Sequence, residues 1–353
     1  MTISSSRTSI LGWGVSRHLL RAAAFLLCLA CAPATVFARS HKPPQAPPRL
    51  PEHILVGYWQ NFTSSAAANQ TLAQVPAAYT IIEVSFADPD RPIDGGVTFA
   101  LNPQLSRAIP GGYSTTQFIA DIQTLHQQGR FVLLSVGGEH RSFALTSNEM
   151  VANFVSSTYA LIRQYGFDGI DIDLENVITV GNYTFLEDAL RQLSARAGPK
   201  LMITMAPQTN DMLPANPALD NYLKIAIDLG NIITMVNTQY YNSGTKRGRD
   251  GKVYAEGTID FITSQADAVL QYLDPSKFGI GLPASPAGRG YMPPAMINAA
   301  FDCLTSGIHC GSYLPVAKYP TLRGVMDWST NWDAANGNQL SSAVSAHMSE
   351  LPR

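Results

Sequence analysis

The sequence has few charged residues and no excess of either sign. Charged side chains make up 14% of its 353 residues, and the formal net charge is -2. Nucleic-acid-binding surfaces depend on clustered Lys and Arg, so this balance gives no indication of a nucleic-acid partner. Hydrophobic residues make up 46% of the chain, a value typical of a globular protein with a large core.

Arginines and an apolar run that is short for a membrane span mark the first segment. Arg7, Arg17 and Arg21 precede "AAAFLLCLACA", and a small-residue pattern ends at Ala38. This arrangement is typical of a secretory signal, so we predict a signal peptide over residues 1–38. An uncleaved anchor is the alternative. After cleavage we expect a monomer with no membrane contact, extracellular or periplasmic in a Gram-negative host.

Cysteine is scarce, with only four residues in the chain. Cys28 and Cys31 are removed with the predicted signal peptide. Cys31 could indicate a lipid anchor, but Cys28 occupies the position at which lipoprotein signals carry Leu or a similar aliphatic residue. Cys303 and Cys310 remain. In an oxidising compartment they should form a disulfide, and a zinc site would need further ligands that are not nearby.

The sequence lacks a glycine-rich phosphate turn after its first apolar run, which an open doubly wound sheet would favour. Apolar runs of strand length alternate with helix-like segments such as 115–128, 150–165, 183–196 and 258–273. The strand-like runs are 54–59, 80–86, 131–138, 166–175, 200–207, 232–241, 278–283 and 323–329. Eight strands with helical crossovers predict an α/β fold, a (β/α)8 TIM barrel.

The predicted barrel is a single domain over residues 52–353, and a proline-rich linker over 39–51 precedes it. The doubly wound sheet remains the alternative fold. Only about forty residues separate Pro283 from Arg323, little more than one crossover helix needs. We therefore expect no large insertion between the seventh and eighth strands.

Four acids lie within the strand-like stretch "FDGIDIDLEN". Strand side chains alternate, so Asp171, Asp173 and Glu175 should project to one side, roughly 7 Å apart along the chain, with Asp168 out of register. Buried like charges raise one another's pKa, so part of this row should hold protons near neutral pH. A calcium or magnesium site is the alternative, but the stretch lacks the glycine and the glutamate that a calcium loop carries at its sixth and twelfth positions. We expect no metal.

Other functional side chains should join these acids, because catalytic groups of such barrels gather at the carboxyl ends of the strands. Glu175 lies at such an end. The other strand ends carry Tyr58, Trp59, Met205, Gln239, Tyr241, Asp327 and Trp328.

The spacing D-x-x-D-x-D-x-E, at Asp168, Asp171, Asp173 and Glu175, resembles the signature of family 18 glycoside hydrolases, the chitinases. The resemblance extends from residue 54 to roughly residue 335 and accounts for every predicted strand. Its further motifs are "SVGG" at 135–138, "MAP" at 205–207, "QYYN" at 239–242 and "MDWS" at 326–329.

The resemblance implies catalytic roles for four residues. Glu175 would be the general acid for the glycosidic oxygen. Asp173 would orient and polarise the substrate's acetamido group, and Asp171 would share a proton with Asp173. Tyr241 would hydrogen-bond the acetamido carbonyl. No cofactor is implied.

The resemblance also implies binding and structural roles. Trp328 would form an apolar floor under the sugar, with Gln239 and Asn242 beside it, and we add Tyr58, Trp59 and Met205 as substrate-binding candidates from their strand-end positions. Structural roles near the site fall to Asp168, Gly169, Ser135, Gly137, Gly138, Ser85 and Phe86. Ser135 could bond Asp171, and the bonds Ser85-Phe86 and Trp328-Ser329 match places where relatives have cis peptides.

Three functions are compatible with the resemblance. The first is a secreted endo-chitinase that cleaves β-1,4-linked N-acetylglucosamine polymers by substrate-assisted retaining catalysis. The second is an endo-β-N-acetylglucosaminidase that acts on N-linked glycans, and the third is a non-catalytic chitin-oligosaccharide-binding relative. Glu175 disfavours the third, because departure of the leaving alkoxide needs a proton donor. The "QYYN" variant favours the first.

Overall fold

The computed structural model describes residues 50–213 and 221–351. The predicted signal peptide over residues 1–38, with Cys28 and Cys31, lies outside the described residues. So does the predicted linker over 39–51, except for its last two residues. No helix within the described ranges is long and apolar enough to cross a membrane.

Eight parallel strands form a closed barrel, as predicted, and the doubly wound alternative is wrong. Their order is β1, β11, β10, β7, β6, β5, β4 and β2, and β1 closes the ring by pairing with β2. The strands are β1 (Ile54–Gln60), β2 (Tyr79–Pro89), β4 (Phe131–Gly137), β5 (Gly169–Asp173), β6 (Met202–Met205), β7 (Met235–Gln239), β10 (Phe278–Pro283) and β11 (Gly324–Trp328).

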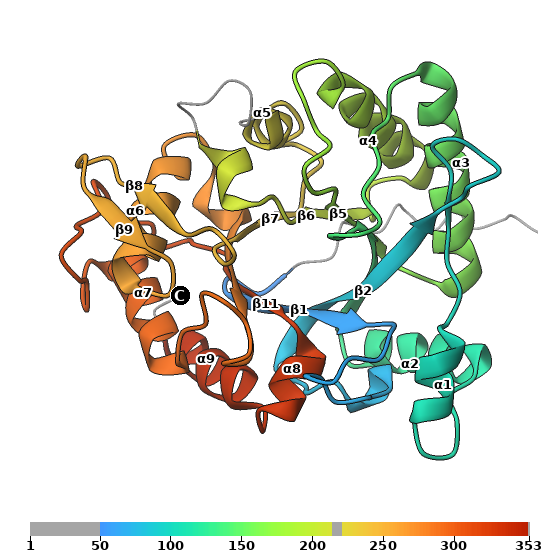
Figure 1. Cartoon of the computed structure of the whole chain (residues 1–353), viewed down its shortest axis with the longest axis horizontal. Coiled ribbons are helices and arrows are strands. Elements are labelled where there is room, and N and C mark those ends of the chain that lie inside the picture. Colours follow the sequence, from blue (N-terminus) through green and yellow to red (C-terminus); the bar gives the residue numbers. More distant parts are fainter. Residues whose placement is uncertain (1–49, 214–220, 352–353) are drawn as a thin grey trace, which may run out of the picture. The chain divides into compact units, whose positions relative to one another are not determined.

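Helices surround the strands (Figure 1). The α-helices are α1 (Pro103–Ala108), α2 (Thr115–Gln127), α3 (Asn148–Tyr165), α4 (Tyr183–Ala197), α5 (Asn221–Asp228), α6 (Ile259–Val269), α7 (Pro294–Ser306), α8 (Thr330–Ala335) and α9 (Gln339–Glu350). Single 3-10 turns are η1 (Leu72–Gln74), η2 (Thr209–Met212) and η3 (Pro275–Lys277). Helix α3 begins where the Ser147 side chain accepts a bond from the Met150 amide, and ends at Gly166 with a left-handed φ of 83°.

Strand alternation divides the apolar side chains into two cores. Inside the barrel lie the side chains of Val56, Ile81, Leu133 and others. A larger core lies between the strands and the helices and includes Ile170, one of the residues that separate the acids of β5. Because successive strand residues face opposite sides, the acids of β5 point into the barrel while their neighbours pack against the helices.

The connections between strands add little to the barrel. Strand β3 (Val97–Thr98) extends β2, and a small hairpin of β8 (Thr245–Arg247) and β9 (Val253–Ala255) follows β7. Between β10 and β11, the seventh and eighth barrel strands, the chain forms only α7 and its flanking loops, so the predicted absence of a large insertion is confirmed. The expected disulfide joins Cys303 of α7 to Cys310.

Candidate active site

The acidic row begins on β5, which approaches its neighbour β6 very closely. A Cβ atom at Gly169 would lie 1.8 Å from the Met202 carbonyl oxygen, so only glycine fits at that position. From there Asp171 and Asp173 point into the barrel, and both are almost fully buried. Glu175 follows two residues beyond the end of β5 and is half-buried at the barrel mouth.

Asp171 lies deepest in the row and lies within hydrogen-bond distance of three hydroxyl groups. Tyr58 and Ser135 donate to its Oδ2, each at 2.7 Å, and Thr204 lies 2.8 Å from its Oδ1. Burial raises the pKa of Asp171, while these hydrogen bonds act in the opposite direction by stabilising its anion. The Ser135 contact is the one suggested by the family resemblance.

Asp173 occupies the middle of the row. Burial and then the neighbouring charges of Glu175 and Asp171 hold its pKa well above the ordinary value. The side-chain amide of Gln239 donates to Asp173 Oδ1 at 2.8 Å and to the Ala206 carbonyl at 2.8 Å, which fixes the orientation of that amide. Asp173 therefore faces the cavity as a carboxyl group that tends to retain a proton.

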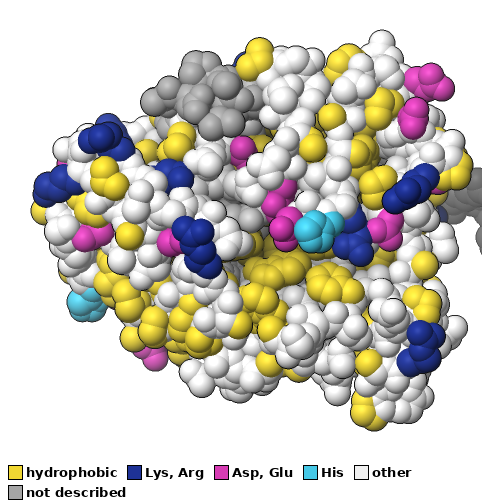
Figure 2. Space-filling model, in the orientation of Figure 1, with side chains coloured by type: hydrophobic (Ala, Val, Ile, Leu, Met, Phe, Trp, Pro, Cys, Tyr) yellow, Lys and Arg dark blue, Asp and Glu magenta, His cyan; other side chains and the backbone are white. Residues whose placement is uncertain are grey.

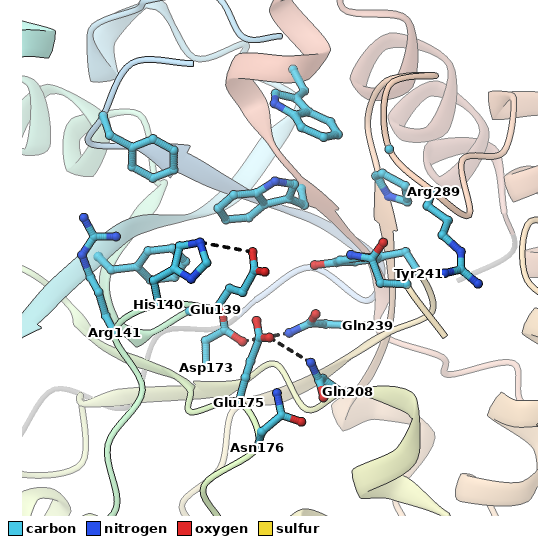
Figure 3. A pocket seen from close by; sticks show the side chains of 18 of the residues that line it. Glu139, His140, Arg141, Asp173, Glu175, Asn176, Gln208, Gln239, Tyr241 and Arg289 are labelled. Atoms are coloured by element: carbon cyan, nitrogen blue, oxygen red, sulfur yellow. Dashed lines mark hydrogen bonds and ion pairs between the residues drawn. The ribbon is translucent and has the colours of Figure 1, made fainter. Parts of the chain in front are cut away.

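Glu175 is held from two sides at the mouth. Its Oε2 accepts a 2.8 Å bond from Gln208 (Figure 3), and its backbone amide donates to Ser142 Oγ at 2.7 Å. Burial raises the pKa of Glu175, whereas hydrogen bonds from Gln239 and Gln208 lower it. Half-buried with an upward-shifted pKa, this carboxyl group is suited to donating a proton to a molecule in the cavity.

A cavity of about 980 Å³ lies above the acids. Its floor is aromatic. Trp328 stacks on Phe86 with 5.8 Å between ring centroids, and the ring centroids of Trp328 and Phe62 are 6.4 Å apart. Figure 2 shows the hollow, with hydrophobic side chains along one side and acidic and histidine side chains along the other. The polar rim includes Glu139, His140, Arg141, Asn176, Asn242 and Arg289. An apolar floor opposite hydrogen-bonding groups suits a sugar ring.

Several predicted site residues meet at this cavity. Asp173, Glu175, Gln239, Tyr241, Asn242 and Trp328 all line it. Burial raises the pKa of Tyr241 well above its usual value, and the charges of Asp173 and Glu175 raise it further, so the phenol remains a hydrogen-bond donor.

Three predicted substrate-binding residues do not reach the cavity. Tyr58 is 1% exposed and points inward, where its hydroxyl holds Asp171. Trp59, its neighbour on β1, points outward and packs against Phe118, with 5.8 Å between ring centroids. Met205 also faces the helix layer, because Thr204 before it points inward. A position at a strand end indicates the correct edge of the barrel, but alternation decides which side chains reach the cavity.

Asp168 is structural but lies away from the site. It precedes β5, at the amino end of the barrel, where its Oδ2 accepts bonds of 2.8 Å from the Val132 amide and the His126 ring. The placement near the active site is therefore wrong, because the amino ends of parallel strands gather opposite the mouth.

The predicted backbone features lie directly beside the acids. Gly137 has φ 118°, and a Cβ there would lie 2.1 Å from the Asp173 carbonyl oxygen. Gly138 donates to the same oxygen at 2.7 Å. The peptide bonds Ser85-Phe86 and Trp328-Ser329 are both cis, as predicted.

Sequence reasoning missed several groups that act on the acids, namely Thr204, Ser142, Gln208 and Glu83. Gln208 comes directly after the predicted strand end "MAP", and its position as a polar residue just beyond a strand could have indicated it. Glu83 is fully buried inside the barrel and contacts Thr204. Its signal was a single charged residue within the apolar run "TIIEVSF". Trp332 also lines the cavity, and the sequence analysis gives it no role.

No metal-binding arrangement was found among the described residues, where no group of three or more His, Cys, Asp or Glu side chains is placed to hold an ion.

A family model described as "Glycosyl hydrolases family 18" matches residues 54–333. Chitinase D of Niallia circulans is 34% identical over 325 residues, covering 82% of this chain, and Chitinase Chi52 of Paenibacillus xylanexedens is 33% identical over 324 residues, also covering 82%. Each match spans 60% of the relative's own length.

Solved structures agree in fold over most of the chain. A structure from Streptomyces coelicolor is 48% identical with a TM-score of 0.79, covering 85% of this chain and 99% of that one. A family GH18 chitinase from Chromobacterium violaceum is 33% identical with a TM-score of 0.79, and the match covers 86% of this chain and 85% of that one.

Replacing Gln208 by Leu should raise the pKa of Glu175, because the substitution removes a hydrogen bond that stabilises the carboxylate. Glu175 would then keep its proton to a higher pH. Carboxyl carbon NMR of protein labelled at glutamate would follow this titration. Gln104→Leu is the matched control, since Gln104 also lines the cavity and should leave Glu175 unchanged. An unchanged Glu175 titration in Gln208→Leu would contradict the assigned hydrogen bond.

Proposed function

The chain belongs to family 18 of the glycosyl hydrolases, and we propose that it is a secreted endo-chitinase that cleaves β-1,4-linked N-acetylglucosamine polymers. The observation that carries the proposal is the convergence of Asp173, Glu175, Tyr241 and Trp328 on one cavity. The names of the curated relatives, Chitinase D and Chitinase Chi52, support the substrate class. The predicted signal peptide supports export.

Glu175 would be the general acid. Its raised pKa increases the fraction of the carboxyl group that is protonated at a given pH, and its position at the mouth gives a bound glycosidic oxygen access to that proton. Trp328, stacked on Phe86, would carry the apolar face of the sugar being cleaved. Gln239 and Asn242 would hydrogen-bond the same sugar.

A separate acid to attack the sugar from the opposite face is not evident among the acids that line the cavity. Asp173 and Glu175 come from the same side of β5 and its extension, and the third acid, Glu139, is exposed beside His140 on the rim. Ordinary retaining glycosidases instead place two carboxyl groups about 5 Å apart on either side of the bond. The nucleophile would therefore be the acetamido oxygen of the substrate.

In the first step the acetamido oxygen bonds to the anomeric carbon, the glycosidic C–O bond breaks, and the Glu175 proton passes to the leaving oxygen. Asp173 and Tyr241 hold the acetamido group for this attack, which gains from the high effective concentration of a group in the same molecule. The first step thus closes a five-membered oxazolinium ring. In the second step Glu175 takes a proton from water as that water attacks the anomeric carbon and breaks its bond to the acetamido oxygen, which opens the oxazolinium ring. Two displacements retain the β configuration.

Glu175→Gln should lower kcat by about 10²–10⁴-fold with little change in substrate binding, because the amide keeps the shape but has no acidic proton to give. Turnover and binding of N-acetylglucosamine oligomers would measure both effects. Glu139→Gln is the matched control, since it changes another acid of the same cavity. Comparable losses in both variants would contradict the roles given to Glu175 and to the substrate's own acetamido group.

The new reducing end should form as the β-anomer, and fully deacetylated chitosan should not be cleaved, because it lacks the attacking group. Proton NMR of the first products from an N-acetylglucosamine oligomer reads the anomer before mutarotation. Initial α-anomer, or cleavage of the deacetylated polymer, would overturn substrate assistance. Cleavage of a high-mannose glycopeptide in place of chitin oligomers would favour the endo-β-N-acetylglucosaminidase alternative.

The enzyme should cut within chains and release them after few cuts. Helix α7 is the only helix between β10 and β11, so no extra module deepens the groove there, and only two of the tryptophans, Trp328 and Trp332, line the described cavity. Product sizing on insoluble chitin should give a mixture of oligomers in the earliest samples. Disaccharide as the dominant product from the start would argue for processive cutting instead.

A further inference from the structure

Glu83 is a buried acid that the proposed mechanism does not use. It lies on β2 with its side chain inside the barrel and is 0% exposed. It does not line the cavity; its nearest functional neighbour is Thr204 of β6, which also contacts Asp171. A carboxyl group in so dry a position is costly unless it is neutral or fully hydrogen-bonded.

The contacts of Thr204 require a proton on one of two acids. Its hydroxyl oxygen lies 2.8 Å from Glu83 Oε1 and 2.8 Å from Asp171 Oδ1. A hydroxyl group has one hydrogen and can donate to only one of these oxygens. The other contact is a hydrogen bond only if the carboxyl group itself carries the hydrogen. Either Glu83 or Asp171 is therefore protonated.

The remaining contacts place that proton on Glu83. Asp171 has two further donors, Tyr58 and Ser135, both on its Oδ2, and these favour its anion. Besides Thr204, Glu83 has the amide of Asn237 at 3.5 Å and the nearby Tyr58 hydroxyl, whose single hydrogen is donated to Asp171 at 2.7 Å. No hydrogen bond reaches its Oε2 from the described residues. An ionised Glu83 would leave an unpaired charged oxygen in the barrel interior.

The surroundings of Glu83 also disfavour its anion. The titratable groups that act on it are Asp171 and Asp173 from β5, Asp327 from β11, Tyr58 from β1, and Tyr241 after β7. The charges of Asp171 and Asp327 raise the pKa of Glu83, whereas hydrogen bonds from Thr204 and Tyr58 lower it. Burial, followed by the charge of Asp171, holds the pKa of Glu83 well above its ordinary value.

We propose that Glu83 carries a proton on Oε1 and donates it in a hydrogen bond to Thr204, whose hydroxyl then donates to Asp171. This relay gives Asp171 a third hydrogen-bond donor and keeps its carboxylate ionised. The proton that Asp171 and Asp173 share then stays on Asp173, next to the cavity. Glu83 is thus a positioning residue that acts through Thr204. Its mechanistic importance rests on the proposed function, whereas its protonation does not.

Infrared difference spectroscopy on Glu83→Gln tests the protonation directly. The amide of Gln can donate to Thr204 as the protonated acid does, so the fold should be retained. At neutral pH the wild-type minus variant spectrum should show the carbonyl stretch of a protonated carboxyl group. Glu149→Gln, at an exposed position, should remove a carboxylate band instead. If the difference spectrum of Glu83→Gln shows a carboxylate band instead, Glu83 is ionised in the wild type and the proposal is overturned.

The pH dependence of stability provides a second test. With its pKa raised in the folded state, Glu83 binds a proton in the folded protein that the unfolded chain releases above about pH 4.5. Wild-type stability should therefore fall, relative to Glu83→Gln, as pH rises from there toward the folded-state pKa. The Tm of the variant minus that of the wild type should grow with pH. A constant difference would mean that Glu83 ionises normally.

The relay is tested by Thr204→Val, with Thr204→Ser as the matched control that keeps the hydroxyl. Thr204 is buried and does not line the cavity, so Val should lower kcat about tenfold with little change in KM, while Ser stays near wild type. Equal kcat values for Val, Ser and wild type would remove the positioning role. If the wild type cleaves no chitin, the proposed function fails, yet the infrared and Tm results still decide the protonation of Glu83.

Discussion

The burial of carboxyl groups along the barrel axis is the constraint on which the rest of the site depends. Glu83, Asp171 and Asp173 are all almost fully buried. Charge in such a place must be neutralised or hydrogen-bonded, and here hydroxyl and amide donors from neighbouring strands serve that purpose. Tyr58, Ser135 and Thr204 around Asp171, and Gln239 beside Asp173, come from β1, β4, β6 and β7. The barrel is therefore a support for these acids as much as a hydrophobic core.

Most of the fold could be predicted from the sequence because the signals are local. Apolar runs separated by helix-length segments indicated all eight strands, and the four helices anticipated at 115–128, 150–165, 183–196 and 258–273 correspond to α2, α3, α4 and α6. The β8–β9 hairpin was missed, because its strands of three residues carry no periodic pattern long enough to recognise. Five of the eight strand ends were placed too late, and β5, for example, stops at Asp173, before Glu175.

The site was only partly predictable, because which side a residue faces depends on register. The row of Asp171, Asp173 and Glu175 was recognisable from its spacing of two. Applied to β1, the same alternation separates Tyr58 from Trp59, but the sequence does not say which of the two faces inward. Hydrogen bonds between distant strands, such as that from Gln208 to Glu175, depend on the closed barrel and leave no trace in either segment alone.

The pairing of β1 with β11 has a consequence for how the chain reaches this structure. The first strand has one neighbour, β2, nearby in sequence, while its other edge is covered only by the last strand. One contact across this seam joins His53 to Leu322, which are 269 positions apart in the sequence. Until residues 324–328 have been synthesised, the backbone groups on that edge of β1 stay unpaired and can associate with other chains. Shortening the chain before β11 would thus create an aggregation-prone edge on its first strand as well as on β10.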